Sequence, residues 1–381
     1  MGWLDDQLDF RWAGISPSQT FALTRPGQLA CQQMAQIAIL DCQTPRYLPT
    51  SKGEAASRWD ESTGTFVESH PEGGRPLGKR QSRFGNLARS WKMNRHFVTN
   101  WADGQQWNYP ELMPDLLGTP ILQYARKRMQ RGQVVLLPLS WHFMGPGSAN
   151  LPVEGDPMPF KDKSARLIWR GSISGTVPLN ERDLWWAASS FQPNQTSNAK
   201  IYLTQTTRWK IVQSLIETPW ADVRLILSKS ETAAMARNPE LQDLLAGMTG
   251  QRQSQAHQRE GKFLLVVDGN DIGTNKYWSL LSNSVTLIVD SEWETALDAG
   301  LEPWVHYVPV PPEREAIEAT VDDLLRHPQR CEDIIQAAHA LLRPQLDVAR
   351  REAADYATLL RYQEQVICTA DLPVNWSLAR C

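Results

Sequence analysis

The sequence predicts an α/β protein with two domains. Its 381 residues exceed the usual size of a single domain. In the second half, short apolar runs alternate with segments in which apolar residues recur at helical spacing. Runs that are apolar throughout are typical of strands buried on both faces, so this alternation indicates βαβ units around a parallel sheet. A hydrophobic content of 41% is sufficient for such cores.

The second half contains the clearest elements. Strands are predicted at 165–169, 223–227, 263–267, 284–289 and 304–310. Helices are predicted at 207–217, 275–281, 292–299 and in three stretches between 312 and 363. Ligands of parallel sheets bind beyond the carboxyl ends of the strands. The loops after Trp169 and Val267 are therefore expected at the binding edge.

The first half is less regular. The predicted elements are a helix at 27–40, a surface loop at 50–82, a strand at 96–100, a helix at 120–129 and a strand at 133–139. A glycine- and proline-rich segment, MGPGSANLPVEGDPMP, marks a domain boundary. We therefore predict a first domain over 1–155, whose first 90 residues are poorly assigned, and a second over 156–345. The remaining 346–381 would form a C-terminal helix that could cross back to the first domain.

Composition excludes several classes of protein. The 39 basic and 42 acidic residues give a net charge of -3, which argues against bulk electrostatic binding of nucleic acid. The five cysteines are scattered and form no CxxC pair, so no zinc site is expected. Their odd number and scatter indicate a reducing compartment rather than a disulfide framework. The N-terminal MGWLDDQLDFRW is too acidic for a signal peptide, and no apolar segment reaches the roughly 20 residues of a membrane helix. These features predict a cytoplasmic protein.

The segment LIWRGSISG, at 167–175, is the first candidate for chemistry. Glycine lets backbone approach a ligand closely, and a serine can donate a hydrogen bond. Arg170 can fork onto two phosphate oxygens. The alternative interpretation is a strand followed by a turn with one solvated arginine.

The segment VDGNDIGTNKYWSLLSNSV, at 267–285, is the second candidate. Gly269 and Gly273 allow tight backbone conformations, and Thr274 is placed to cap a helix that starts near Asn275. Helix N-termini favour anions. A metal site would need Asp268 and Asp271 on one cation, but their spacing is not DxD and the EF-hand pattern is absent. Asp271 could instead accept hydrogen bonds from loop N–H groups. The pattern favours the anion site.

The segment NWADGQQW, at 100–107, is the third candidate. Asp103 follows a predicted strand, and apolar neighbours would raise its pKa toward a value useful to a general base. An ordinary Asp-Gly turn is the alternative, and these residues alone favour it. Trp101, Trp107 and Trp141 lie in polar surroundings, where an indole can stack on a sugar, although most tryptophans simply pack.

Few other residues suggest chemistry. Glu292 follows a predicted strand and could accept hydrogen bonds from ribose hydroxyls. His306 is expected to be a packed strand residue rather than a catalyst. HExxH, GxSxG, the P-loop lysine motif and GxGxxG are all absent, and the last absence weakens a dinucleotide-dehydrogenase interpretation.

Three of these segments together resemble a known family. ARLIWRGSISGT…ERD, KFLLVVDGNDIGTNKYWSLLSNSVTLIV and EW…LEPWVHYVPV follow the order and spacing of glycosyltransferase family 90. This family contains the CAP10 and LpsA-like lipopolysaccharide-modifying enzymes and the Rumi-type protein O-glucosyltransferases. The resemblance extends from about 97 to 342, and the first 90 residues match no family that we can name.

The resemblance implies a GT-B fold, in which two Rossmann-like domains face each other across a cleft. The second domain would bind a nucleotide sugar, typically UDP-linked, such as UDP-glucose or UDP-xylose. The first would bind a glycan, lipopolysaccharide or protein acceptor. Such enzymes invert the anomeric centre and generally need no metal, so no cofactor is expected beyond the donor co-substrate. A location peripheral to the inner membrane stays open.

The resemblance also implies roles for individual residues. Asp103 matches the general base, and Arg170, Gly171 and Ser172 match the donor-diphosphate RGS motif. Glu292 matches the acidic member of an EW pair. Eukaryotic members carry arginines where this chain has Asp268 and Asn275. Donor contacts from that loop would therefore come from backbone N–H groups, Thr274 and Asn275. Gly269 and Asp271 of the same loop are also expected among the donor-binding residues.

Three rival interpretations stay open. A non-catalytic nucleotide- or carbohydrate-binding protein of the same fold would bind UDP without transferring a sugar. A sugar phosphorylase or epimerase would use the same fold for another reaction. A purely structural protein is disfavoured, because polar glycine-containing loops follow three consecutive strands.

Overall fold

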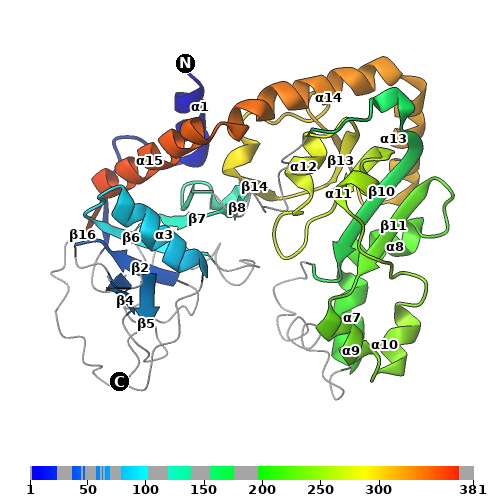
Figure 1. Ribbon diagram of the computed structural model, residues 1–381, viewed down its shortest axis with the longest axis horizontal. Coiled ribbons are helices and arrows are strands. Elements are labelled where there is room, and N and C mark those ends of the chain that lie inside the picture. The colour runs from blue at the N-terminus through cyan, green and yellow to red at the C-terminus, as the bar shows by residue number, and fades with distance from the viewer. Residues whose placement is uncertain are drawn as a thin grey trace.

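The computed structural model describes residues 2–23, 37–43, 46–47, 57–60, 62, 65–68, 79–101, 119–138, 155–175 and 196–368. Figure 1 shows these residues as two α/β lobes side by side, with the C-terminal helices running from the second lobe back to the first. None of the described helices combines the length and the apolar character needed to cross a membrane.

The second lobe is built on a parallel sheet. Among the described residues, five strands form it in the order β11-β10-β12-β13-β15, and every adjacent pair is parallel. The strands are β10 (Ser164–Ser172), β11 (Ala221–Ile226), β12 (Gly261–Val266), β13 (Val285–Val289) and β15 (Val308–Val310). β12 and β13 are apolar and almost wholly buried, which explains why their apolar runs were readable in the sequence. The predicted parallel sheet is confirmed.

Helices flank this sheet on its two faces (Figure 1). Those of the second lobe are α7 (Thr196–Gln205), α8 (Thr207–Leu215), α9 (Lys229–Met235), α10 (Pro239–Leu244), α11 (Gln255–Gln258), α12 (Lys276–Leu280), α13 (Arg314–Arg326) and α14 (Pro328–Leu342). The α8 helix starts at Thr206, whose side chain accepts a hydrogen bond from the Trp209 N–H at 3.3 Å. Its residues Ile211, Val212 and Leu215 are buried against the sheet.

The first lobe is built on a mixed sheet. Among the described residues, seven strands follow the order β5-β4-β3-β2-β6-β7-β9, and only the β6-β7-β9 part is parallel. The strands are β2 (Ile37–Asp41), β3 (Arg46–Tyr47), β4 (Ser57–Asp60), β5 (Thr65–Glu68), β6 (His96–Asn100), β7 (Ile121–Gln123) and β9 (Val134–Leu136). The helix α3 (Lys79–Ser90) lies near this sheet (Figure 1). Two α/β lobes thus give the predicted GT-B-like architecture.

The end of the chain packs on the first lobe. The helix α15 (Val348–Gln365) lies beside α1 (Trp3–Arg11), and Arg11 Nη1 contacts Asp355 Oδ1 at 2.6 Å inside this contact. The strand β16 (Val366–Cys368) pairs in parallel with β1 (Phe21–Leu23). The guanidinium of Arg361 stacks over the Trp12 ring at 4.5 Å. The C-terminal helix α15 therefore packs on the first lobe.

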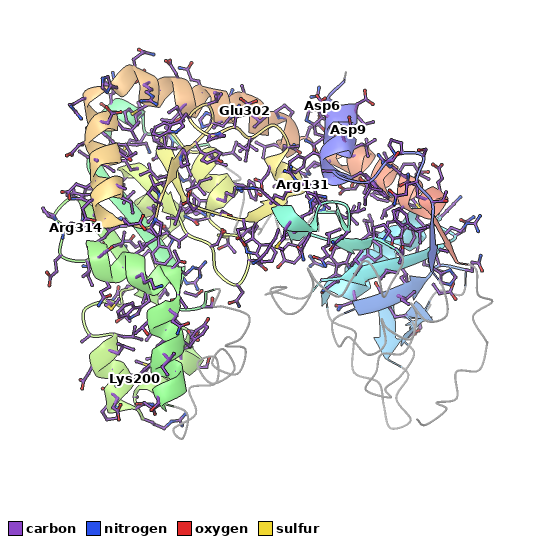
Figure 2. All side chains as sticks on the ribbon, turned by 180° about the vertical axis from the view of Figure 1, so that it is seen from behind. Asp6, Asp9, Arg131, Lys200, Glu302 and Arg314 are labelled. Atoms are coloured by element: carbon purple, nitrogen blue, oxygen red, sulfur yellow. The ribbon has the colours of Figure 1, made fainter. Side chains whose placement is uncertain are left out.

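A two-stranded ribbon joins the lobes. The strand β14 (Trp293–Thr295), which lies in the chain between β13 and β15 of the second-lobe sheet, pairs antiparallel with β8 (Ala125–Lys127) of the first lobe. Glu294 on β14 contacts Arg126 Nε at 2.7 Å and Arg131 Nη2 at 2.6 Å. Arg126 also donates to the carbonyls of Phe10, Arg11 and Val134. Figure 2 shows Arg131 where the two lobes meet.

Three predictions for the first half are wrong. The helix predicted at 27–40 ends in strand β2, the loop predicted at 50–82 contains β4, β5 and the start of α3, and the helix predicted at 120–129 is β7, β8 and a 3₁₀ turn at Arg128–Gln130. The common cause is that these strands are only three to five residues long, too short to show a clear period of two. Their pairing with other strands decides their structure, and it overrides the local pattern.

Two predictions for the second half also need correction. The helix predicted at 292–299 is β14 followed by a 3₁₀ turn, Ala296–Asp298. The strand predicted at 304–310 is reduced to β15, because Trp304 adopts a positive φ of 64° and the preceding residues form a turn. His306 accordingly lies partly exposed in that turn, where its Nδ1 accepts a hydrogen bond from the Glu302 N–H at 3.0 Å.

Candidate functional site

The carboxyl edge of the second-lobe sheet brings two predicted segments together. The RGS segment at the end of β10 and the loop after β12 line one cavity of about 520 Å³. Its walls also include Arg208 of α8, Ser228 and Glu231 near the end of β11, and Gln253 and Gln258 around α11. The proximity of the first two segments follows from the parallel pairing of β10 with β12.

The RGS residues belong to the strand itself rather than to a turn after it. The strand β10 continues through Ser172, and Gly171 lies directly against the Trp169 ring. A Cβ atom at Gly171 would come within 2.2 Å of that ring, so only glycine fits there. Ser172 reaches the cavity, and its hydroxyl accepts a hydrogen bond from Arg208 Nη1 at 2.8 Å.

Arg170 is bound within the sheet, although it also lines the cavity. Its Nη2 contacts Asp222 Oδ1 at 2.8 Å, and its Nη1 donates to the carbonyls of Trp169 and Asp222. Burial raises the pKa of Asp222, but hydrogen bonding and charge from Arg170 outweigh this effect and lower it overall. The phosphate fork predicted for Arg170 would have to compete with these contacts, and it stays a prediction.

Arg208 is the residue that sequence reasoning missed. It stands in the first turn of α8, 7% exposed, and it donates to the Ser172 carbonyl and hydroxyl and to the Val267 carbonyl. Its Nε has no hydrogen-bond partner within the described part of the chain, where it also forms no ion pair. Burial lowers its pKa to about 10, opposed by the charges of Asp268 and Asp271. A buried cation that lines a cavity without a carboxylate partner can bind an anion there.

A signal for Arg208 was present in the sequence. Arg208 shares one helical face with Ile211, Val212 and Leu215, at spacings of three, four and seven residues. An arginine on the apolar face of a helix must be buried with hydrogen-bond partners or exposed to a cavity.

The loop of 268–275 is held by its own polar groups. Asp268 Oδ1 accepts a hydrogen bond from the Gly273 N–H at 3.0 Å, and the Gly269 N–H donates to the Asp271 carbonyl at 2.9 Å. Burial raises the pKa of Asp268, although hydrogen bonding from Ser291 and the charge of Lys276 oppose it. Neither glycine in the loop has a positive φ. Gly269 is needed for close approach instead, because a Cβ there would come within 2.7 Å of Arg208 Nη2.

The predicted cap of the following helix is wrong. The helix α12 starts at Lys276, and its N-cap is Asn275 rather than Thr274, without a side-chain capping hydrogen bond. The Asn275 side chain donates to the Leu265 carbonyl at 2.7 Å, which fixes the loop to β12. Thr274 is exposed, and both residues line the cavity. With five residues, α12 is too short for a strong helix dipole, so the positive charge of this cavity comes from the arginines that line it, Arg170, Arg208 and Arg252.

Asp271 contacts the first lobe. The Tyr124 hydroxyl, which lies between β7 and β8, donates a hydrogen bond to Asp271 Oδ2. Both side chains are buried. Asp271 is therefore placed at the junction of the lobes as well as beside the cavity.

Glu292 lines a different cavity. This second cavity, of about 930 Å³, lies between the lobes and is lined by Phe10, Lys127 and Arg128 of the first lobe and by Asp268, Lys276 and Tyr307 of the second. The Glu292 side chain is 72% exposed and contacts Lys127 Nζ at 3.0 Å. Its predicted contact with ribose would require a ligand that spans both cavities, and it stays a prediction.

The remaining predicted residues lie in the first lobe. Trp101 is 1% exposed and packs on Phe84 at a ring distance of 5.2 Å, so it cannot stack on an acceptor in this arrangement. That prediction is corrected by the structure, because Trp101 belongs to the core of the lobe. Asp103, Trp107 and Trp141 lie outside the described residues.

The described residues that line the first cavity do not form a metal ligand set. Across the described residues, no three His, Cys, Asp or Glu side chains come together as ligands of a metal ion would. Asp268 and Asp271, the pair considered for a cation, use their carboxylates to accept hydrogen bonds from Gly273 and Tyr124.

Two curated proteins are similar to part of the chain. The O-glucosyltransferase LpsA of Dichelobacter nodosus is 24% identical over 184 residues, which are 48% of this chain and 44% of that protein. Uncharacterized protein 035R of Invertebrate iridescent virus 3 is 26% identical over 192 residues, which are 49% of this chain and 16% of that protein. The match thus spans less than half the length of each of these relatives.

Solved structures give a weaker likeness. Anabaena HepE, determined in complex with UDP and glucose, aligns with a TM-score of 0.38 at 8% identity, covering 74% of this chain and 76% of that one. A glycosyltransferase from Rickettsia africae aligns with a TM-score of 0.35 at 11% identity, covering 66% of each chain. Because these scores are low, the fold assignment depends on the sheets themselves.

The match to a family model is broader. The model of glycosyl transferase family 90 matches residues 148–366, which is more than half of the chain. The matched range contains the whole second-lobe sheet, Arg208 and the loop of 268–275. The chain therefore belongs to glycosyl transferase family 90.

Proposed function

We propose that the chain is an inverting glycosyltransferase that moves a sugar from a UDP-linked donor, such as UDP-glucose or UDP-xylose, to a hydroxyl of a glycan, lipopolysaccharide or protein acceptor. Family membership and similarity to a protein named an O-glucosyltransferase support this reaction class. One observation carries the proposal. The buried Arg208 guanidinium, which forms no ion pair within the described residues, lines a cavity at the carboxyl edge of a parallel sheet, where a nucleoside diphosphate can supply negative charge.

The donor diphosphate would lie against Arg208 and the end of β10. The unpartnered Nε of Arg208 can donate to a phosphate oxygen, and the Ser172 hydroxyl lies 2.8 Å from Nη1 of the same guanidinium. Thr274 and Asn275, in the loop of 268–275, also line this cavity. The nucleoside would extend toward Gln253 and Gln258, whose amides can hydrogen-bond to a base edge.

The reaction would be a single displacement at C1 of the donor sugar. Asp103 takes the proton from the acceptor hydroxyl, the acceptor oxygen forms a bond to C1, and the bond from C1 to the UDP oxygen breaks. General-base assistance of this kind contributes roughly 10²–10⁴-fold. Negative charge grows on the leaving diphosphate, and Arg208 is positioned to stabilise it. We propose that the Arg208 guanidinium stabilises the leaving diphosphate in place of the Mg²⁺ ion that other transferases use.

The acceptor would occupy the cavity between the lobes. Its lining combines acidic and basic side chains with Phe10, Trp293 and Tyr307. Polar groups of both signs beside aromatic rings suit a neutral sugar with many hydroxyls. The loop of 268–275 separates the two cavities, so donor and acceptor would meet along its edge.

A thermal-shift panel of nucleotides and nucleotide sugars, followed by a transfer assay, tests the proposal. A UDP sugar at 100 times its Kd should stabilise the protein by about 2.7 kcal/mol. Transfer to a glycan acceptor should release UDP, invert the anomeric configuration and continue in EDTA. If none of the nucleotides or nucleotide sugars stabilised the protein, the proposal would be contradicted. Full loss in EDTA with rescue by Mn²⁺ would overturn the metal independence.

The same experiment separates the rivals. Binding of UDP without transfer to any acceptor would identify a non-catalytic nucleotide- or carbohydrate-binding protein. Turnover with inorganic phosphate would identify a phosphorylase, and isomerisation of the donor would identify an epimerase.

Replacing Gly269 by alanine should weaken UDP binding. The new Cβ would come within 2.7 Å of Arg208 Nη2, so the guanidinium has to move away from its acceptors. Losing one hydrogen bond to a charged group corresponds to about a tenfold rise in Kd. Isothermal titration with UDP measures this. Gly155→Ala is the control, because a Cβ at Gly155 meets nothing within 4 Å. Equal affinities for the two variants would refute the expected contact.

A further inference from the structure

The loop of 268–275 is a wall shared by two cavities. Asp268, at its start, and Lys276, just after its end, line the cavity between the lobes. Gly269, Asp271 and Asn275 line the cavity proposed for the donor. Any shift of this loop therefore changes both cavities at once.

The first lobe contacts this wall through Tyr124. The Tyr124 side chain is completely buried, and its hydroxyl donates to Asp271 Oδ2. Ile272, the next residue of the loop, packs in the same apolar cluster as Tyr124. Tyr124 directly precedes β8, which pairs with β14 of the second lobe. The tyrosine is thus fixed in place by the ribbon that joins the lobes.

The contact also reaches the cation of the donor cavity. The negative charge of Asp271 stabilises the guanidinium of Arg208, and the Asp271 carbonyl accepts the Gly269 N–H at 2.9 Å. Gly269 in turn lies against that guanidinium. The hydroxyl of Tyr124 therefore helps to fix where the Asp271 carboxylate lies relative to Arg208.

We propose that Tyr124 is a positioning residue for donor binding, which acts through Asp271. It holds the Asp271 carboxylate on the side of the first lobe, away from the open face of Arg208. Without the hydroxyl, the carboxylate loses a donor, and the nearby guanidinium becomes its best substitute partner. A paired Arg208 would bind a diphosphate less well. This inference rests on the proposed function, because it assumes that Arg208 binds the donor diphosphate.

The test is Tyr124→Phe, which removes the hydroxyl and keeps the ring. The Kd for UDP, measured by titration calorimetry, should rise about tenfold, the effect of one hydrogen bond to a charged group. In the transfer assay the KM for the UDP sugar should rise, and kcat should fall by a smaller factor, because the guanidinium keeps its charge beside the leaving diphosphate. Tyr362→Phe is the matched control, because this buried tyrosine donates to the Pro120 carbonyl at 2.6 Å far from the cavity. The control should bind UDP as the wild-type protein does.

A second background decides whether the effect passes through Asp271. In Asp271→Asn protein, removing the Tyr124 hydroxyl should change the UDP Kd by less than about threefold, because the charged acceptor is gone. Equal losses in both backgrounds would overturn the proposal, and so would a Tyr124→Phe variant that is less stable yet binds UDP normally. Absence of UDP binding by the wild-type protein would instead overturn the proposed function together with this inference.

Discussion

Replacing Arg208 by glutamine is expected to lower kcat/KM for the UDP sugar by about 100- to 1000-fold, the usual effect of removing one preorganised donor from a developing negative charge. The guanidinium lies where a diphosphate would enter the cavity, and its Nε has no other partner in the described residues. The substitution should change both KM and kcat. The ground-state diphosphate already carries charge, so KM should rise, and kcat should fall because that charge grows in the transition state.

Arg351→Gln is the matched control for this substitution. Arg351 is also 7% exposed and donates to two backbone carbonyls, those of Gln345 and Leu346, and it does not line the cavity. Both variants should lose stability, but only Arg208→Gln should lose UDP affinity. Arg208→Lys should recover part of the activity, because it restores the charge without the planar fork. If Arg208→Gln and Arg351→Gln turned over equally well, the diphosphate would have to bind elsewhere.

The second-lobe sheet could be predicted because its strands are locally unambiguous. The strands β12 and β13 are buried on both faces, so each contains an unbroken apolar run. The helices of this lobe show apolar residues at helical spacing instead. In the first lobe only β6 and β9 give such a strand signal, and both were predicted as strands. Its β7 and β8 together cover a stretch, ILQYARK, in which apolar residues fall at helical spacing. Only distant partners, β6, β9 and β14, make those residues strands.

In the candidate site, too, one part could be predicted from the sequence and another could not. The RGS strand end and the loop of 268–275 could be placed together because a parallel sheet puts consecutive strand ends on one edge. What each side chain does there could not be predicted. Arg170 was expected to face phosphate, but Asp222 on the neighbouring strand pairs with it. Asp271 was considered for a metal or a donor, but a tyrosine from the other lobe contacts it. In both cases the partner lies more than 50 residues away in the chain, which no local motif records.

Replacing Glu294 by glutamine should destabilise the protein by about 3–5 kcal/mol, because it leaves a buried cation without its counter-charge. Arg126 is completely buried, and Glu294, with a side chain 6% exposed, is the carboxylate that contacts it. Burial raises the pKa of Glu294, but Arg131 and Arg126 outweigh that effect and lower it overall. A carboxylate whose pKa is lowered by folding contributes stability above the pKa of the unfolded chain. This contribution is lost as the pH falls through the folded pKa, so the difference between wild type and variant should shrink in acid.

Glu292→Gln is the control two residues earlier on the same segment. Glu292 also contacts a basic residue of the first lobe, Lys127 at 3.0 Å, but its side chain is 72% exposed, so its loss should change the stability by less than about 1 kcal/mol. Urea unfolding of both variants at neutral and acidic pH measures the comparison. Because Glu294 lies on the ribbon that joins the lobes, its loss should also separate their unfolding into two calorimetric transitions. A Glu294→Gln protein as stable as Glu292→Gln, with a single transition, would show that apolar packing rather than this ion pair holds the lobes together.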